Sequence, residues 1–188
     1  MEGLLLAAGA GRRMGRPKAL VSDDDGPWLV RGVTTLRDGG CDRVTVVLGA
    51  DVDGARSLLE GLDVQVVVAD DWAEGMGASL RAGLRSLASS SDEGVVVSLV
   101  DLPDLVPEVV RRVVAQAVAG GDGPAALARA SYDGKPGHPV LLGRDHWAGV
   151  IETAVGDQGA RAYLAPRDVL LVECGDLASG RDVDSPSG

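Results

Sequence analysis

Short, almost wholly apolar runs recur along the chain, and each is bounded by glycine, aspartate or proline. Runs of this kind are typical of strands buried on both faces of a sheet. In chain order they are residues 4–8, 44–49, 64–69, 95–100, 125–130, 139–142 and 169–173. Between most of them, apolar residues recur every three or four positions, which indicates helices. The expected helices are residues 28–39, 52–59, 76–87 and 107–119.

This alternation of strand and helix predicts an α/β fold. We expect a three-layer α/β/α, Rossmann-like arrangement, in which helices cover both faces of a mostly parallel, twisted sheet. The alternation loosens after Gly120, which favours a mixed sheet edge or a small extension there. Residues 22–26 read as a polar loop, and the chain from residue 178 onward reads as an extended surface segment. No linker indicates a second domain, so we expect one domain over residues 1–188.

Composition and charge narrow the range of partners. The 188-residue chain carries a net charge of −10, which argues against nucleic acid, because phosphate backbones need a basic surface. Cys41 and Cys174 lack metal-site spacing and are expected to be buried thiols. Basic residues follow the short apolar start instead of preceding it, and no segment reaches transmembrane length. The expected location is the cytoplasm, with no membrane partner.

The loop after the first apolar run carries the strongest signal for a ligand. In open α/β sheets, ligands bind beyond the carboxyl ends of the strands. Gly9, Gly11 and Gly15 let backbone N–H groups approach an anion closely, and Lys18 and Arg13 follow with positive charge. In an acidic protein this pattern favours phosphate binding. The alternative is a glycine-rich turn with solvated arginines.

Two common phosphate motifs do not fit this loop. It lacks the Gly-Lys-Ser/Thr of a Walker A loop, and Met14 stands where a dinucleotide fingerprint needs its third glycine. Gly49 stands near the place where a dinucleotide-binding fold would carry an acidic residue. A dinucleotide-binding dehydrogenase is therefore not favoured.

Carboxylates at two places are candidates for a metal site. Asp101 follows the run 95–100, and a hard oxygen ligand at that edge suits Mg²⁺. The alternative is a turn cap, although Asp104 is the better cap for the helix at Pro107. Asp182 and Asp184 point the same way if the tail is extended, and one of them is a second ligand candidate. The alternative for this pair is a solvated acidic tail.

Several motifs together resemble one family. The stretch from Leu6 to Lys18 is similar to the signature loop of nucleotidyltransferases with the nucleotide-diphospho-sugar transferase fold. Within them it most resembles the MobA/MocA-like branch, the molybdenum cofactor guanylyl- and cytidylyltransferases. Residues 72–80, 100–103, 137–139, 156–161 and 182–186 match further motifs in the family's order. The resemblance therefore extends over nearly the whole chain.

The resemblance implies an enzyme that transfers a nucleoside monophosphate from a triphosphate to a phosphorylated acceptor and releases pyrophosphate. Mg²⁺ is the implied cofactor. The implied catalytic residues are Arg13, Lys18 and Asp101, and the implied metal ligands are Asp101 and Asp184. The residues expected to bind the nucleotide are Leu6, Ala7, Ala8, Gly9, Ala10, Gly11, Arg12, Arg13, Gly15, Lys18, Asp71, Gly77 and Ser79.

Acceptor-binding residues are implied in the second half of the chain. They are His138, Asp157 and Arg161, and the segment from Tyr132 to Pro136 reads as an acceptor-site loop. The alternatives are that Asp157 caps the following helix and that Arg161 is solvated on its first turn. Ser79 also has a plain alternative as a helix residue.

The sequence defines the nucleotide base and the acceptor molecule less closely. Ala stands before Gly9 where guanylyltransferases tend to carry another glycine, which favours CTP over GTP. Molybdopterin is the first acceptor candidate, and a sugar 1-phosphate or phospholactate is the alternative. Gln158, where the family usually has lysine, supports another class of function: a catalytically silent nucleotide-binding factor in molybdoenzyme maturation, with maturation proteins as partners.

Overall fold

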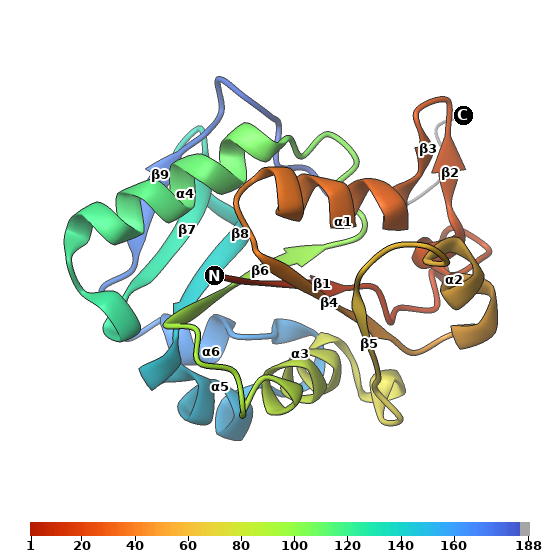
Figure 1. The fold of residues 1–188 in the computed structure, drawn as a ribbon, viewed down its shortest axis with the longest axis horizontal. Helices are drawn as coiled ribbons and strands as arrows, with labels where there is room; N and C mark the ends of the chain where they lie inside the picture. The colour runs from red at the N-terminus through yellow and green to blue at the C-terminus, as the bar shows by residue number, and fades with distance from the viewer. Residues whose placement is uncertain (185–188) are drawn as a thin grey trace.

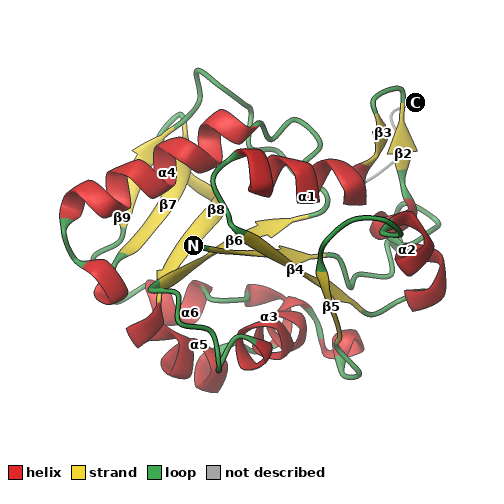
Figure 2. Cartoon of the chain, viewed as in Figure 1, coloured by secondary structure: helices red, strands yellow, loops and turns green. Residues whose placement is uncertain are grey.

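The fold is a mostly parallel sheet between two layers of helices, in a computed structural model that describes residues 1–184 (Figures 1 and 2). The sheet has the order β5-β4-β1-β6-β8-β7-β9. Its strands are β1 (Glu2–Leu6), β4 (Arg43–Leu48), β5 (Gln65–Val68), β6 (Gly94–Leu99), β7 (Leu127–Tyr132), β8 (Lys135–Gly143) and β9 (Leu170–Glu173). Only β8 runs against its neighbours β6 and β7 within this sheet of the described chain. The predicted mixed region after Gly120 is thereby confirmed.

Helices cover both faces of the sheet. They are α1 (Trp28–Asp38), α2 (Val52–Leu58), α3 (Met76–Ser86), α4 (Pro107–Gly120), α5 (Trp147–Thr153) and α6 (Arg161–Leu164). Figure 1 shows α1 and α4 on one face and α3, α5 and α6 on the other. The three-layer prediction is confirmed. Among the described residues, no helix is both long and apolar enough to span a membrane.

Alternation along the central strands explains why both faces need helices. Leu5 of β1 and Val96 of β6 are fully buried in the core beneath α1 and α4. Leu4 of β1, one residue earlier, is fully buried in the other core with α3 and α5. Successive strand residues point to opposite faces, so an uninterrupted apolar strand supplies both cores. This chain does so with aliphatic side chains, since it contains no phenylalanine.

Two segments differ from the prediction. Residues 22–26, expected to be a loop, include a short hairpin of β2 (Ser22–Asp23) and β3 (Gly26–Pro27). The expected acceptor-site loop is the turn of another hairpin, because β8 already begins at Lys135 and pairs with Tyr132. Main-chain hydrogen bonds hold this end of β8 in the sheet without an apolar pattern, so side-chain periodicity could not reveal it.

Strand register brings distant loops to one edge of the sheet. Leu6, the last residue of β1, is aligned with Leu99, the last residue of β6. The glycine-rich loop and Asp101 therefore leave the sheet side by side. Because β8 is antiparallel to β6, with Val97 opposite Val140, the beginning of β8 lies at this same edge.

The C-terminal tail also runs back to this edge. Arg112 of α4 makes a two-pronged ion pair with Asp176, at 2.6 and 2.9 Å. Asp104 accepts hydrogen bonds from the backbone and hydroxyl of Ser179. Asp104 was expected to cap α4, but the residue before α4 provides no side-chain cap, and Asp104 anchors the tail instead. The predicted surface segment is therefore fastened to the fold.

Candidate active site

The glycine-rich loop after β1 lines a cavity of about 590 Å³. Gly11 has φ of 58°, and a Cβ there would collide with the carbonyl oxygen of Arg16. Glycine is thus required at position 11 by the loop itself. A Cβ at Gly9, by contrast, would meet no protein atom within 4 Å, so the space beside Gly9 is open to a ligand.

Lys18 joins the loop to two carboxylates from elsewhere in the chain. Its Nζ donates to Asp101 Oδ2 and to Asp184 Oδ1, both at 2.6 Å. Arg13 Nη2 lies 2.8 Å from the other oxygen of Asp184. Burial lowers the pKa of the Lys18 ammonium, but the hydrogen bonds to Asp101 and Asp184 outweigh it and raise the pKa above its ordinary value. The hydrogen bond from Lys18 lowers the pKa of Asp184, with Arg13 adding to the effect.

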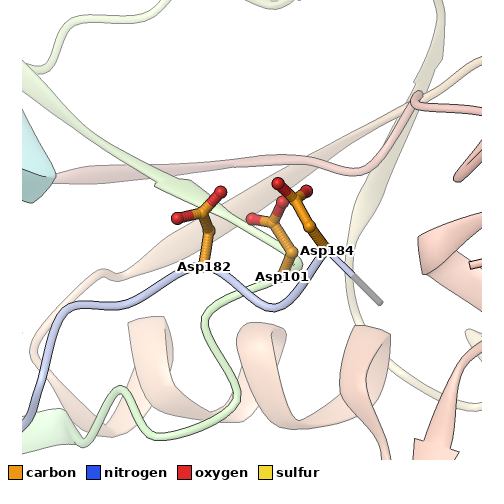
Figure 3. Close-up of side chains that lie close together, drawn as sticks. All are labelled: Asp101, Asp182 and Asp184. Carbon is orange, nitrogen blue, oxygen red and sulfur yellow. The ribbon is translucent and has the colours of Figure 1, made fainter. Parts of the chain in front are cut away.

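Three carboxylates converge beside Lys18. One oxygen each from Asp101, Asp182 and Asp184 lies within 4.8 Å of the others. Figure 3 shows the three side chains pointing the same way, Asp101 from the loop after β6 and the other two from the tail. Oδ1 of Asp101 is buried and has no hydrogen-bond partner among the described residues. A buried carboxylate oxygen without a partner, beside two further carboxylates, fits a hard divalent cation such as Mg²⁺ or Mn²⁺.

Most of the residues expected to bind nucleotide line this cavity. Those that do are Leu6, Ala8, Gly9, Ala10, Gly11, Arg12, Arg13, Lys18 and Ser79. The cavity is also lined by Trp72, Gly75 and Met76, which were not singled out although they fall within the matching stretch 72–80.

Four of the residues expected to bind nucleotide do not line this cavity. Ala7 is buried in the core beneath α1. Gly15 takes a turn with φ of 72°. Asp71 pairs with Arg81 at 2.8 Å. Gly77 lies against the backbone of Ala154, where a Cβ would not fit, so packing explains this glycine.

The implied acceptor residues lie together in an adjoining cavity. His138, Asp157 and Arg161 all line a second space of about 300 Å³. Asp157 does not cap α6, because the residue before α6 makes no side-chain cap. Arg129 of β7 lines the same space and was missed, since nothing in its sequence context distinguishes it from a solvated arginine.

On this side of the site, two side chains of the β7–β8 hairpin donate hydrogen bonds to the hairpin's own backbone. Nε and Nη2 of Arg129 donate to the carbonyl oxygen of Gly137, at 3.1 and 2.9 Å. The Tyr132 hydroxyl donates to the carbonyl oxygen of His138 at 2.7 Å. Burial, with the charges of Arg129 and Arg161, lowers the pKa of His138 to about 4. His138 is therefore neutral at pH 7.

The two cavities form one cleft. Both are lined by Leu6, Met76, Leu99, Asp101, Asp157 and Asp182. Asp101 thus stands at the junction, where two bound molecules would meet. The arrangement can hold a phosphate chain in the larger cavity, a cation at the junction and a second small molecule beyond it.

Known proteins are similar to this chain in sequence and in fold. The sequence profile of the MobA-like NTP transferase domain matches residues 3–171. The chain is 37% identical to nicotine blue oxidoreductase of Paenarthrobacter nicotinovorans, over 98% of this chain and 92% of that protein. It is 30% identical to molybdenum cofactor guanylyltransferase of Rhodobacter capsulatus, over 80% of this chain and 67% of that protein.

Solved structures show the same fold. The crystal structure of Rv0371c from Mycobacterium tuberculosis has a TM-score of 0.76 and 28% identity, and the match covers 98% of this chain and 92% of that one. A manganese complex of Rv0371c has a TM-score of 0.72 and 26% identity, with 92% and 87% covered. The chain therefore belongs to the MobA-like NTP transferase family, whose nucleotidyltransferases have the nucleotide-diphospho-sugar transferase fold.

Proposed function

We propose that this protein is a Mg²⁺-dependent nucleotidyltransferase that uses CTP in preference to GTP and molybdopterin as the acceptor. One observation carries the proposal: Lys18 bridges Asp101 and Asp184 at the junction of two cavities, the larger of which is lined by a glycine-rich loop. The guanylyltransferase named above supports a molybdenum cofactor acceptor. The choice of CTP rests on the alanine that precedes Gly9.

The proposed reaction is a direct displacement at the α-phosphorus. An oxygen of the acceptor phosphate forms the new bond, and the bond to the bridging oxygen breaks, so pyrophosphate leaves with the electron pair. Both reactants are anionic, which makes charge repulsion and positioning the main catalytic problems. The acceptor phosphate is already ionised, so no general base is required, and neutral His138 is suited to binding only.

Different residues of the cleft would bind the phosphate chain, supply positive charge and hold the cation. The glycine loop offers backbone N–H groups to the phosphate chain, while Lys18 and Arg13 supply positive charge. Asp101 and Asp184 would hold the cation, with Asp182 within reach. When bound, Mg²⁺ supplies positive charge to the α-phosphate and to the departing pyrophosphate.

The first experiment is pyrophosphate release with Mg²⁺, with CTP, GTP, ATP and UTP in parallel, each with and without molybdopterin. Release that depends on molybdopterin, is fastest with CTP and is lost in Asp101→Ala would support the proposal. Triphosphate binding without release would favour another phosphorylated acceptor, such as a sugar 1-phosphate, or a silent maturation factor that binds molybdoenzyme partners. Absence of triphosphate binding would contradict the proposal.

An oxidoreductase activity is the second candidate, because the 37% identical relative is named for one. The reaction would move a hydride from a reduced donor, such as a nicotinamide dinucleotide, to an acceptor that also takes a proton from water. The glycine loop itself does not match a dinucleotide fingerprint, because Met14 stands where the third glycine would be. Loss of nicotinamide absorbance with a quinone-type dye would detect it. Activity with the dye but none with any triphosphate would replace the first proposal by this one.

The proposed location is the cytoplasm. Cys41 and Cys174 are both free and buried, as expected for thiols kept in a reducing compartment.

A further inference from the structure

The smaller cavity separates its charges in a way that the proposed reaction does not require. Three carboxylates, those of Asp101, Asp157 and Asp182, line both cavities and so lie toward the junction. Arg129 and Arg161, by contrast, line only the smaller cavity. The smaller cavity therefore carries both charges: its three carboxylates are shared with the larger cavity, and its two arginines are not.

Within residues 1–184, neither of these arginines has its charge neutralised by a carboxylate. Among residues 1–184, no carboxylate lies within ion-pair distance of Arg129 or Arg161. Arg129 is half-buried, and burial together with the charge of Arg161 lowers its pKa. Two like charges held close together, one of them partly desolvated, favour an anion between them. Arg81, also half-buried, shows the contrast, because it pairs with Asp71 and Glu74.

Much of the remaining wall is apolar, and His138 and Gln158 are its polar side chains. The apolar part includes Leu6, Leu80, Val97, Val140 and Leu142. Most of these apolar side chains are otherwise buried in the core, and they offer no hydrogen bond to a ligand. A volume of about 300 Å³ lies at the lower end for small-molecule sites and suits one or two fused rings.

We propose that the smaller cavity selects acceptors that combine an apolar ring with an anionic group, which Arg129 and Arg161 bind. The shared chemistry is a phosphate or a carboxylate on a ring. This inference rests on the proposed function only in calling the occupant an acceptor. Arg129 is positioned for the task by its two hydrogen bonds to Gly137, which fix the plane of its guanidinium.

Direct binding tests the inference without any transfer reaction. The probes are phenyl phosphate, benzoate, inorganic phosphate and phenol, measured by calorimetry on the full chain saturated with Mg²⁺ and a non-hydrolysable CTP analogue, so that the glycine loop is occupied. Phenyl phosphate and benzoate are the two arms that distinguish phosphate from carboxylate. At least one of them should bind about tenfold more tightly than phenol or inorganic phosphate.

Two variants and a matched control locate the binding. Arg161→Met and Arg129→Met should each weaken binding of the preferred probe about tenfold and leave binding of the CTP analogue unchanged. Arg56→Met, on exposed α2, should change neither. The backbone carbonyl of Arg161 accepts a hydrogen bond from Ala165, but the side chain of Arg161 makes none to the rest of residues 1–184, so its replacement keeps the test valid even if Arg129→Met fails to fold.

The outcomes separate this inference from the proposed function. Phenol binding as tightly as both charged probes, or charged probes unaffected by Arg161→Met, would overturn the inference while triphosphate binding stands. If the CTP analogue does not bind but a charged probe does and is lost in Arg161→Met, the inference stands and the nucleotidyltransferase proposal fails.

Discussion

The two halves of the cleft, the proposed nucleotide half lined by the glycine loop and the proposed acceptor half around Arg129, arrange their charges differently. In the nucleotide half, the cations Lys18 and Arg13 are already paired with Asp101 and Asp184. In the acceptor half, Arg129 and Arg161 have no carboxylate partner among the described residues, and apolar side chains make up much of the remaining lining.

This difference indicates two modes of binding. The Lys18 ammonium is already paired with Asp101 and Asp184. A metal cation bound to these carboxylates would free Lys18 to bind a phosphate, so we expect the metal and the triphosphate to bind cooperatively. The acceptor half needs no such exchange and is expected to bind its anion by direct contact. A change at the carboxylates should therefore affect the first half far more than the second.

The largest effect is expected from Asp101→Asn. The change keeps the shape of the side chain but removes the negative charge at the junction, and transfer should fall about 10³-fold. Mn²⁺ affinity, followed by electron paramagnetic resonance, should fall with it, while phenyl phosphate binding remains. Asp53→Asn, at an exposed position of α2 that lines neither cavity, is the control. Unchanged Mn²⁺ affinity in Asp101→Asn would refute the assignment of Asp101 as a ligand.

Two glycine substitutions distinguish a glycine that leaves room for a ligand from a glycine that the loop backbone itself requires. Gly9→Ala adds a methyl group that meets no protein atom, so the melting temperature should stay constant while triphosphate binding weakens about tenfold. Gly11→Ala should instead destabilise the fold by about 1–3 kcal/mol, because the backbone there is left-handed and tightly packed. Equal effects of both changes on stability would show that the space beside Gly9 is not reserved for a ligand.

A smaller effect is expected where α4 anchors the tail that carries Asp182 and Asp184. Arg112→Ala removes the two-pronged pair with Asp176 and should lower kcat about fivefold at unchanged KM for the triphosphate, by loosening the metal carboxylates. Arg111→Ala is the matched control, since its partner Glu108 lies on the same exposed helix face. A fall in kcat of equal size in both variants would argue against a positioning role for Arg112.

The smallest effect concerns the hairpin of the acceptor half. Backbone N–H groups of Gly134 and Gly175, with the Ser131 hydroxyl, lower the pKa of Glu173 from 4.5 to about 2. The folded-state pKa lies below the unfolded one, so this stabilisation is complete above pH 4.5 and is lost as the pH falls toward 2.

Urea unfolding at several pH values between 5 and 2 measures this loss. The free energy of unfolding should fall less steeply with decreasing pH in Glu173→Gln than in the unchanged protein. Glu152→Gln, on an exposed position of α5, should leave the slope unchanged. Parallel slopes for the unchanged protein and Glu173→Gln would contradict the prediction.

Local sequence patterns predicted most of the strands and helices of this protein. The apolar runs fixed the number and sequence positions of the sheet's strands, since a strand buried on both faces must be apolar throughout. The loop from Gly9 to Lys18 was also predictable from sequence, because its glycines and charged residues are contiguous, and most of them line the larger cavity. Boundaries shifted by a few residues, most of all at the start of β8, where backbone pairing needs no apolar side chain.

Only the tertiary structure added Arg129 to the acceptor half, whose His138 and Arg161 the family resemblance had implied. Arg129, His138 and Arg161 come from a strand, its antiparallel neighbour and a helix, and no spacing along the chain relates them. The antiparallel direction of β8 and the anchored tail bring them, with Asp182, to the edge where β1 and β6 end. Charged residues that are far apart in sequence can bind one ligand together only when packing places them around one cavity and partly removes them from water.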